Sequence, residues 1–253
     1  MKNFLKSTLL LIHYWFPVVV GWSIILVIHK ATGFPISPEG ELLYMLAIWA
    51  AYSLDRLLDR SGVMRSDWLT AALWIGLFSA ASLGAVIFFW QSPQTMSVML
   101  LFAFITFAYR KAKKFPLLKT LLVAILWTWA GMALPFQNAW QFWTVQTSLP
   151  LVILLAANAI LCDFKDLKSD ERAGVRSLPA MLGLHNTTRI TSFLLVVAAI
   201  ISYEQGRIGL VVSSTVLIGL AQFPLLLSLD AVGPLLADAA LALPGLLIVL
   251  HWV

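Results

Sequence analysis

Two groups of aspartates carry the most distinctive chemistry in this sequence of 253 residues. Asp55 and Asp59 lie four residues apart, and Asp163, Asp166 and Asp170 follow one another at steps of three and four. On an α-helix the members of each group would share one face and repel one another, so a bound cation is the expected compensation. No cluster of histidines or cysteines accompanies them, and ligand sets made only of oxygen suit a hard ion. The spacing therefore predicts a Mg²⁺ site.

A basic segment lies between the two acidic groups in the sequence. It begins at Tyr109, includes Lys111, Lys113 and Lys114, and is followed by Lys119. Mg²⁺ in proteins usually keeps water ligands and takes phosphate oxygens from a substrate, while lysine supplies fixed positive charge for a phosphate. Together, these features suggest a site for a diphosphate with a lipid tail. Each feature alone is more commonly a solvated surface, so the prediction depends on their combination.

The composition identifies the chain as an integral membrane protein. Hydrophobic residues make up 60% of it and charged residues 11%, and the mean hydropathy is +0.89. Soluble domains contain about 25% charged residues, so a water-soluble globule and a disordered chain are both excluded. The single cysteine, Cys162, excludes a disulfide framework and a cysteine-based zinc site.

We expect the apolar runs of the sequence to form transmembrane helices, because a spanning helix needs roughly 20 apolar residues. The chain would be an all-α, polytopic membrane protein of about nine spans, with residues 1–253 forming one domain. An eight-span arrangement, with the run 145–162 re-entrant or peripheral, remains open. The nine runs cover residues 9–29, 41–54, 68–90, 95–109, 117–134, 145–162, 188–203, 207–228 and 234–252.

The basic residues predict how the bundle is oriented. With nine spans, 15 of the 17 Lys and Arg residues fall on one face, and only Lys30 and Arg207 fall on the other. By the positive-inside rule the face rich in Lys and Arg is cytoplasmic. This predicts a multi-pass protein of the cytoplasmic (inner) membrane, with both groups of aspartates facing the cytoplasm. No cleavable signal peptide is predicted. The net charge of +5 reflects these loops, and no nucleic-acid partner is expected.

The order and spacing of these motifs resemble the UbiA superfamily of intramembrane prenyltransferases. That family carries aspartate-rich motifs, NDxxDxxxD and DxxDxxxD, after its second and sixth helices, and a Tyr-x-x-x-Lys-Arg/Lys segment after its fourth. The sequence Asp163-Phe-Lys-Asp166-Leu-Lys-Ser-Asp170 matches the second motif in full. Tyr109, followed by Lys113 and Lys114, matches the central segment in spacing. The resemblance extends over nearly the whole chain.

The resemblance implies a nine-helix bundle with a central cavity that opens to lipid. It also implies Mg²⁺-dependent transfer of a prenyl group from a polyprenyl diphosphate to an aromatic or lipid acceptor. In that scheme Asp55 and Asp59 bind one Mg²⁺ ion. The second Mg²⁺ ion is bound by Asp163, Asp166 and Asp170. The residues implied for the diphosphate are Lys113, Lys114 and Lys119, with Tyr109 at its edge and Arg56 and Lys111 as helpers.

The first acidic motif departs from the family pattern. Ala51 and Tyr52 stand where the family has Asn and its first Asp, so at least one ligand of the first metal is lost. Tyr52 lies on the same helical stripe as Asp55 and is a candidate for binding substrate. Asn158, within the sixth run, is a further candidate for binding substrate; its side chain either faces the cavity or bonds a neighbouring helix. Asp238, an acid inside the ninth run, is a candidate functional residue without an assigned role.

Three other functions remain open from the sequence. The altered first motif is also compatible with a divergent, non-catalytic family member that binds a prenyl lipid or serves as a membrane assembly subunit. A CDP-alcohol phosphotransferase is disfavoured, because the Gly and Ala-Arg that should follow its first Asp are missing here. A secondary transporter agrees with the span count, but the sequence shows no inverted repeat beyond the paired acidic motifs.

Overall fold

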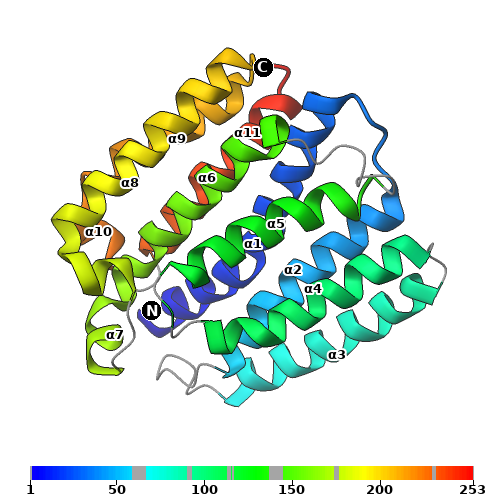
Figure 1. The fold of residues 1–253 in the computed structure, drawn as a ribbon. Helices are drawn as coiled ribbons and strands as arrows, with labels where there is room; N and C mark the ends of the chain where they lie inside the picture. The colour runs from blue at the N-terminus through cyan, green and yellow to red at the C-terminus, as the bar shows by residue number, and fades with distance from the viewer. Residues whose placement is uncertain are drawn as a thin grey trace.

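The apolar runs fold into an all-helical bundle (Figure 1). A computed structural model describes residues 2–58, 67–89, 93–112, 115, 117–136, 145–173, 177–229 and 232–252. Its helices are α1 (Lys2–Thr32), α2 (Pro38–Leu58), α3 (Asp67–Phe89), α4 (Pro93–Ala112), α5 (Leu118–Ala133), α6 (Val145–Cys162), α7 (Leu167–Ala173), α8 (Leu178–Glu204), α9 (Ile208–Ala221), α10 (Pro224–Leu227) and α11 (Val232–Val249). A 3₁₀ turn, Asp163–Asp166, joins α6 to α7.

Each predicted apolar run but one falls on a single helix and extends past its ends by no more than a few residues, which confirms the all-α fold class. Within the described residues, four helices are long and apolar enough to cross a membrane: Trp15–Thr32 in α1, Ser148–Asp166 in α6 with the turn after it, Leu178–Glu204 and Val232–Val249. Four shorter apolar segments lie in α3, α4, α5 and α9. Of the four long ones, Ser148–Asp166 is the most buried, at 67% of its window, so α6 is a central helix rather than a peripheral one.

The prediction of one helix over 207–228 is wrong. The structure ends α9 at Ala221 and starts the short helix α10 at Pro224. Phe223 between them has φ −115° and ψ 63°, outside the helical region. A proline disfavours helical geometry in the residue before it, so Pro224 explains the break.

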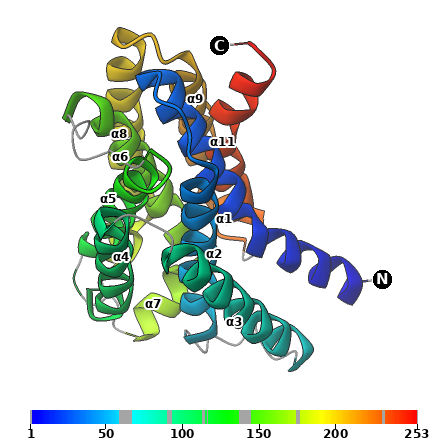
Figure 2. The ribbon, with the colours of Figure 1, turned by 90° about the vertical axis from the view of Figure 1, so that its right-hand side faces the viewer.

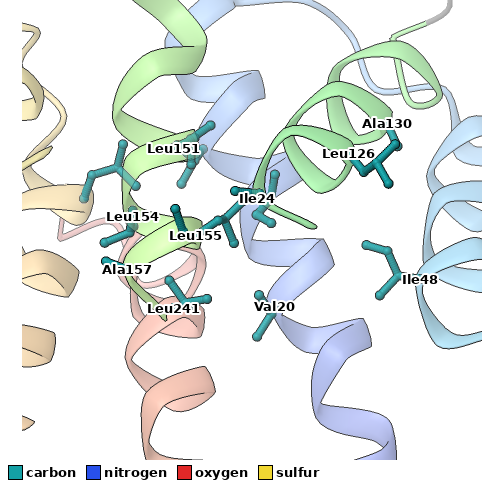
Figure 3. Packing of buried hydrophobic residues seen from close by; sticks show 14 of the residues in the cluster. Val20, Ile24, Ile48, Leu126, Ala130, Leu151, Leu154, Leu155, Ala157 and Leu241 are labelled. Atoms are coloured by element: carbon teal, nitrogen blue, oxygen red, sulfur yellow. The ribbon is translucent and has the colours of Figure 1, made fainter. Parts of the chain in front are cut away.

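The helices pack around α1 and α6. Helix α1 lies between α11 and α2, α6 lies between α5 and α8, and α9 packs on both α8 and α11. Helices α3 and α4 cover the outer sides of α2 and α5 (Figure 1). Figure 2 shows the N-terminal end of α1 extending away from the other helices. The apolar core includes Leu154 and Leu155 of α6 and Ile24 of the neighbouring helix α1 (Figure 3).

Hydroxyl groups from two neighbouring helices support a proline inside α11. Pro244 has no amide hydrogen, so the carbonyl of Ala240, four residues earlier, loses its helical partner. The Ser213 hydroxyl of α9 donates to that carbonyl at 2.5 Å. The Ser23 hydroxyl of α1 accepts from the amide of Gly245 at 2.8 Å. The backbone groups freed in α11 are thus satisfied from α1 and α9, as buried polar groups require.

A close contact joins the start of α2 to the end of α5. The Ser37 amide donates to the carbonyl of Pro135 at 2.7 Å. A Cβ atom at Gly40 would lie 2.0 Å from the carbonyl oxygen of Leu134. Glycine is therefore required at position 40 because the two backbones nearly touch there.

Candidate functional site

The second acidic group lies where α6 ends. The sequence predicted Asp163, Asp166 and Asp170 on one α-helical stripe, whereas the structure places the first two in a 3₁₀ turn and the third in α7. A 3₁₀ turn has three residues per turn, so residues at i and i+3 are eclipsed. Asp163 and Asp166 therefore share a face more closely than α-helical spacing would give, and Asp170 follows one turn later.

Asp163 is buried and forms an ion pair with Lys119. The Lys119 ammonium at the start of α5 donates to Oδ1 of Asp163. The side chain of Asp163 is only 7% exposed and that of Lys119 is 26% exposed. Burying a carboxylate to this degree is costly unless a nearby cation or strong hydrogen bonds compensate its charge. The structure thus brings together two predicted site residues that lie 44 positions apart.

Asp166 and Asp170 complete the acidic group. Lys165 lies 4.0 Å from Asp166, whose side chain is 40% exposed. Burial raises the pKa of the Asp170 carboxyl, and the negative charges of Asp163 and Asp166 act in the same direction. The nearby Ser177 hydroxyl and the Lys119 cation oppose that rise in pKa. The Oδ2 atom of Asp170 is buried and has no hydrogen-bond partner among the described residues.

The effect of Ser177 on Asp170 was not predicted from the sequence. Ser177 directly precedes α8 and is buried. It is separated from the acidic group by residues that the structure does not describe. A serine in a connecting segment carries no spacing signal that would distinguish it from a helix cap.

Much of the first acidic motif and the basic segment lies outside the described side chains. The backbone of α2 includes Asp55 and Arg56 in its last turn, and that of α4 includes Tyr109 and Lys111, but their side chains are not described. Asp59, Lys113 and Lys114 lie outside the described residues. Their roles stay predictions.

Tyr52 lies on α2 and is partly exposed. It packs against a small cluster of Trp49, Leu73 and Ala80 between α2 and α3. The side chain thus contributes to packing between these two helices, and a contact with substrate stays a prediction.

A second polar group lies beside the end of α6. The Nδ2 atom of Asn158 donates to Oδ1 of Asp238 on α11 at 3.0 Å. The Sγ atom of Cys162 lies 4.0 Å from the same carboxylate oxygen. Asn158 therefore bonds a neighbouring helix, as one of the two sequence interpretations proposed. Asp238 lies inside the continuous helix α11, and sequence alone could not have paired it with a residue 80 positions away.

Within the described part of the chain, no three His, Cys, Asp or Glu side chains are arranged closely enough to hold a metal ion by themselves. The acidic group at the end of α6 presents oxygen ligands from one side only. Any octahedral site there would need further oxygens, from another helix end, from water or from a substrate phosphate.

Comparisons with known proteins agree with the fold. The profile of the UbiA prenyltransferase family matches residues 55–252, whereas no curated protein matches the sequence. A UbiA homolog from Aeropyrum pernix has a TM-score of 0.70 at 14% identity, over 93% of this chain and 98% of that chain. A UbiA homolog from Archaeoglobus fulgidus bound to GPP and Mg²⁺ has a TM-score of 0.58 at 15% identity, over 94% and 99%. The same homolog bound to DMAPP and Mg²⁺ has a TM-score of 0.57 at 16% identity, over 93% and 98%.

Proposed function

Because the chain belongs to the UbiA prenyltransferase family, we propose that it transfers a prenyl group from a prenyl diphosphate to an acceptor within the membrane, with Mg²⁺ as its cofactor. The observation that carries this proposal is the contact between Lys119 and Asp163. It joins the lysine that follows the basic segment to the acidic group, so a phosphate-binding charge and metal-binding oxygens lie side by side. The structures of the Archaeoglobus fulgidus homolog with prenyl diphosphates and Mg²⁺ support the same pairing of ligands.

The acidic group fits Mg²⁺ by its chemistry. Its donors are carboxylate oxygens, and the Oδ2 atom of Asp170 is buried without a hydrogen-bond partner among the described residues. Asp163, Asp166 and Asp170 would contribute to one site only together with oxygens from water or the diphosphate, since they do not form a metal site by themselves, and Asp55 and Asp59 would contribute to another. Bound Mg²⁺ would neutralise charge that develops on the diphosphate leaving group.

The remaining work falls to side chains of the chain itself. The reaction breaks the bond between C1 of the prenyl group and the diphosphate oxygen, and the diphosphate leaves with the electron pair. Lys119, together with Lys113 and Lys114, would hold the departing diphosphate through charge-assisted hydrogen bonds. The acceptor then supplies the electron pair for the new bond to C1 and loses a proton. The apolar core around α1 and α6 keeps water away from the electron-deficient carbon.

The family and the long apolar helices make the chain a membrane protein. Within it, we place the acidic and basic motifs at the cytoplasmic side of the inner membrane, because nearly all Lys and Arg residues cluster with them in the sequence. One domain over residues 1–253 would contain the whole site. The acceptor would reach it from the lipid phase.

The test is thermal stabilisation of the purified protein by geranylgeranyl diphosphate, with and without Mg²⁺. A ligand that binds only the folded state adds about 2.7 kcal/mol at a concentration of roughly a hundred times its Kd. We expect stabilisation that needs Mg²⁺ and that is absent in Asp166→Ala. Glu171→Gln removes an exposed carboxylate from α7, the short helix that follows the turn of Asp166, and should keep the full effect.

Three results would contradict this proposal or part of it. Equal stabilisation with and without Mg²⁺ would mean that the aspartates do not bind a metal together with the diphosphate. No stabilisation at any prenyl length would favour the alternative of a non-catalytic member, which the loss of ligands at Ala51 and Tyr52 suggests. Unchanged turnover in Asp166→Ala would remove that residue from the metal site.

A further inference from the structure

The polar pair Asn158 and Asp238 lies within the bundle, next to the acidic group. Asn158 on α6 is five residues before Asp163, and Asp238 reaches the same level from α11. The two side chains are joined at 3.0 Å, and Cys162, the residue before Asp163, lies 4.0 Å from the Asp238 carboxylate. Helix α11 also contacts the 3₁₀ turn that carries Asp163. The pair thus lies close to the start of the acidic group, where α11 packs against the end of α6 and the turn that follows it.

The orientation of the Asn158 amide follows from its partner. A carboxylate oxygen can only accept, so the amide must present its Nδ2 group to Asp238. This leaves the carbonyl oxygen Oδ1 of Asn158, which is buried and has no hydrogen-bond partner among the described residues. The whole residue is only 6% exposed. A buried acceptor left in this way is destabilising, so the position calls for a hydrogen-bond donor.

We propose that Asn158 and Asp238 bind the hydroxyl group of the acceptor molecule, which makes an uncharged alcohol or phenol the acceptor class. This inference rests on the proposed prenyl transfer, because it is the acceptor that must lie beside the diphosphate site. The groups that the pair offers are acceptors of hydrogen bonds, the amide oxygen and the carboxylate. A ligand carboxylate would meet like charge at Asp238, and a ligand ammonium would have to lose its hydration inside the bundle.

A purely structural role explains less of the geometry. Joining α6 to α11 would need one neutral hydrogen bond, such as the serine contacts that already attach α11 to α1 and α9. A carboxylate within a membrane span is expensive and usually marks a functional position. Asp238 is also partly exposed, so one side of it is not covered by the helices that surround it.

The inference can be tested with two probes that share a ring system and differ in one group, 2-naphthalenemethanol and 2-naphthoate. Binding is measured by equilibrium dialysis on protein in nanodiscs that holds geranylgeranyl diphosphate and Mg²⁺, with empty nanodiscs subtracted. The unsubstituted protein should prefer the alcohol by about tenfold, the effect of one charge-assisted hydrogen bond. Asp238→Asn keeps the size and the contact with Asn158 but removes the charge, so the preference should fall to about threefold or less.

Ser213→Ala is the matched control, since it removes another hydrogen bond of α11 without touching the pair. It should leave the tenfold preference unchanged. An equal loss of preference in Ser213→Ala, an unchanged preference in Asp238→Asn, or no preference in the unsubstituted protein would each overturn the inference. Binding of geranylgeranyl diphosphate, measured on the same samples, separates the two failures. If it binds with Mg²⁺ but the preference is absent, only the hydroxyl site is wrong; if it does not bind, the proposed function is wrong as well.

Discussion

Replacing Lys119 with methionine should destabilise the protein, because the buried Asp163 would lose its cation. Two unit charges about 4 Å apart attract by roughly 4 kcal/mol at an effective dielectric constant of about 20. The Lys119 side chain is 26% exposed, and both ions lost hydration when they were buried. These effects reduce the net coupling to about 1–2 kcal/mol. In a chain of this size that corresponds to roughly 2–8 °C in Tm.

The coupling is measured by a double-mutant cycle of Lys119→Met, Asp163→Asn and the double variant, all in the presence of a chelator. Unfolding can be followed by a thiol-reactive dye, because Cys162 is the only cysteine and is partly buried beside Asp163. Each single variant should lose stability, and the double variant should lose less than their sum. Lys168→Met, at an exposed lysine of α7, should change stability by less than about 0.5 kcal/mol. Strict additivity of the two single variants would refute the ion pair as a stabilising contact.

Two further predictions concern the packing of helices. Gly40→Ala should destabilise by about 1–3 kcal/mol, since its Cβ would lie 2.0 Å from the carbonyl oxygen of Leu134. A Cβ atom at Gly84 would meet no atom within 4 Å, so Gly84→Ala should be neutral or stabilising by up to about 1 kcal/mol. Equal denaturation midpoints for Gly40→Ala and Gly84→Ala would contradict the close approach of the two backbones at Gly40. Ser23→Ala should cost about 1–3 kcal/mol, because its hydroxyl bridges a carbonyl and an amide of α11. Ser97→Ala removes an exposed hydroxyl bonded within its own helix and should change the denaturation midpoint little. A loss of stability in Ser97→Ala as large as that in Ser23→Ala would show that the bridge from Ser23 to α11 adds no stability of its own.

The all-helical fold could be predicted from the sequence because long apolar runs dominate it, and most of them have charged residues or proline near at least one end. The break after Ala221 was missed although Pro224 signals it, because the apolar residues continue across it and hydropathy does not register backbone geometry. Similarly, the spacing of Asp163 and Asp166 predicted a shared face, but it could not distinguish an α-helix from the tighter 3₁₀ turn.

The candidate site was predictable only where its residues follow one another. The second acidic motif has a spacing that can be recognised, whereas its ion pair with Lys119 depends on how α5 packs against α6. The bond between Asn158 and Asp238 spans 80 positions and joins two helices whose contact no local pattern encodes. Local chemistry is therefore visible in the sequence, and the partners of that chemistry come from tertiary packing.

The contact between α1 and α11 has a consequence for the biogenesis of the protein. Helix α1 is translated roughly 200 residues before α11, and at synthesis rates of about 5–20 residues per second it waits some 10–40 s for that partner. During this interval the Ser23 hydroxyl cannot make its bonds to α11, and the bundle has an open side. Closure of the bundle is thus a late event. A chain that stalls on the ribosome before α11 is made would leave the side of α1 that carries Ser23 uncovered.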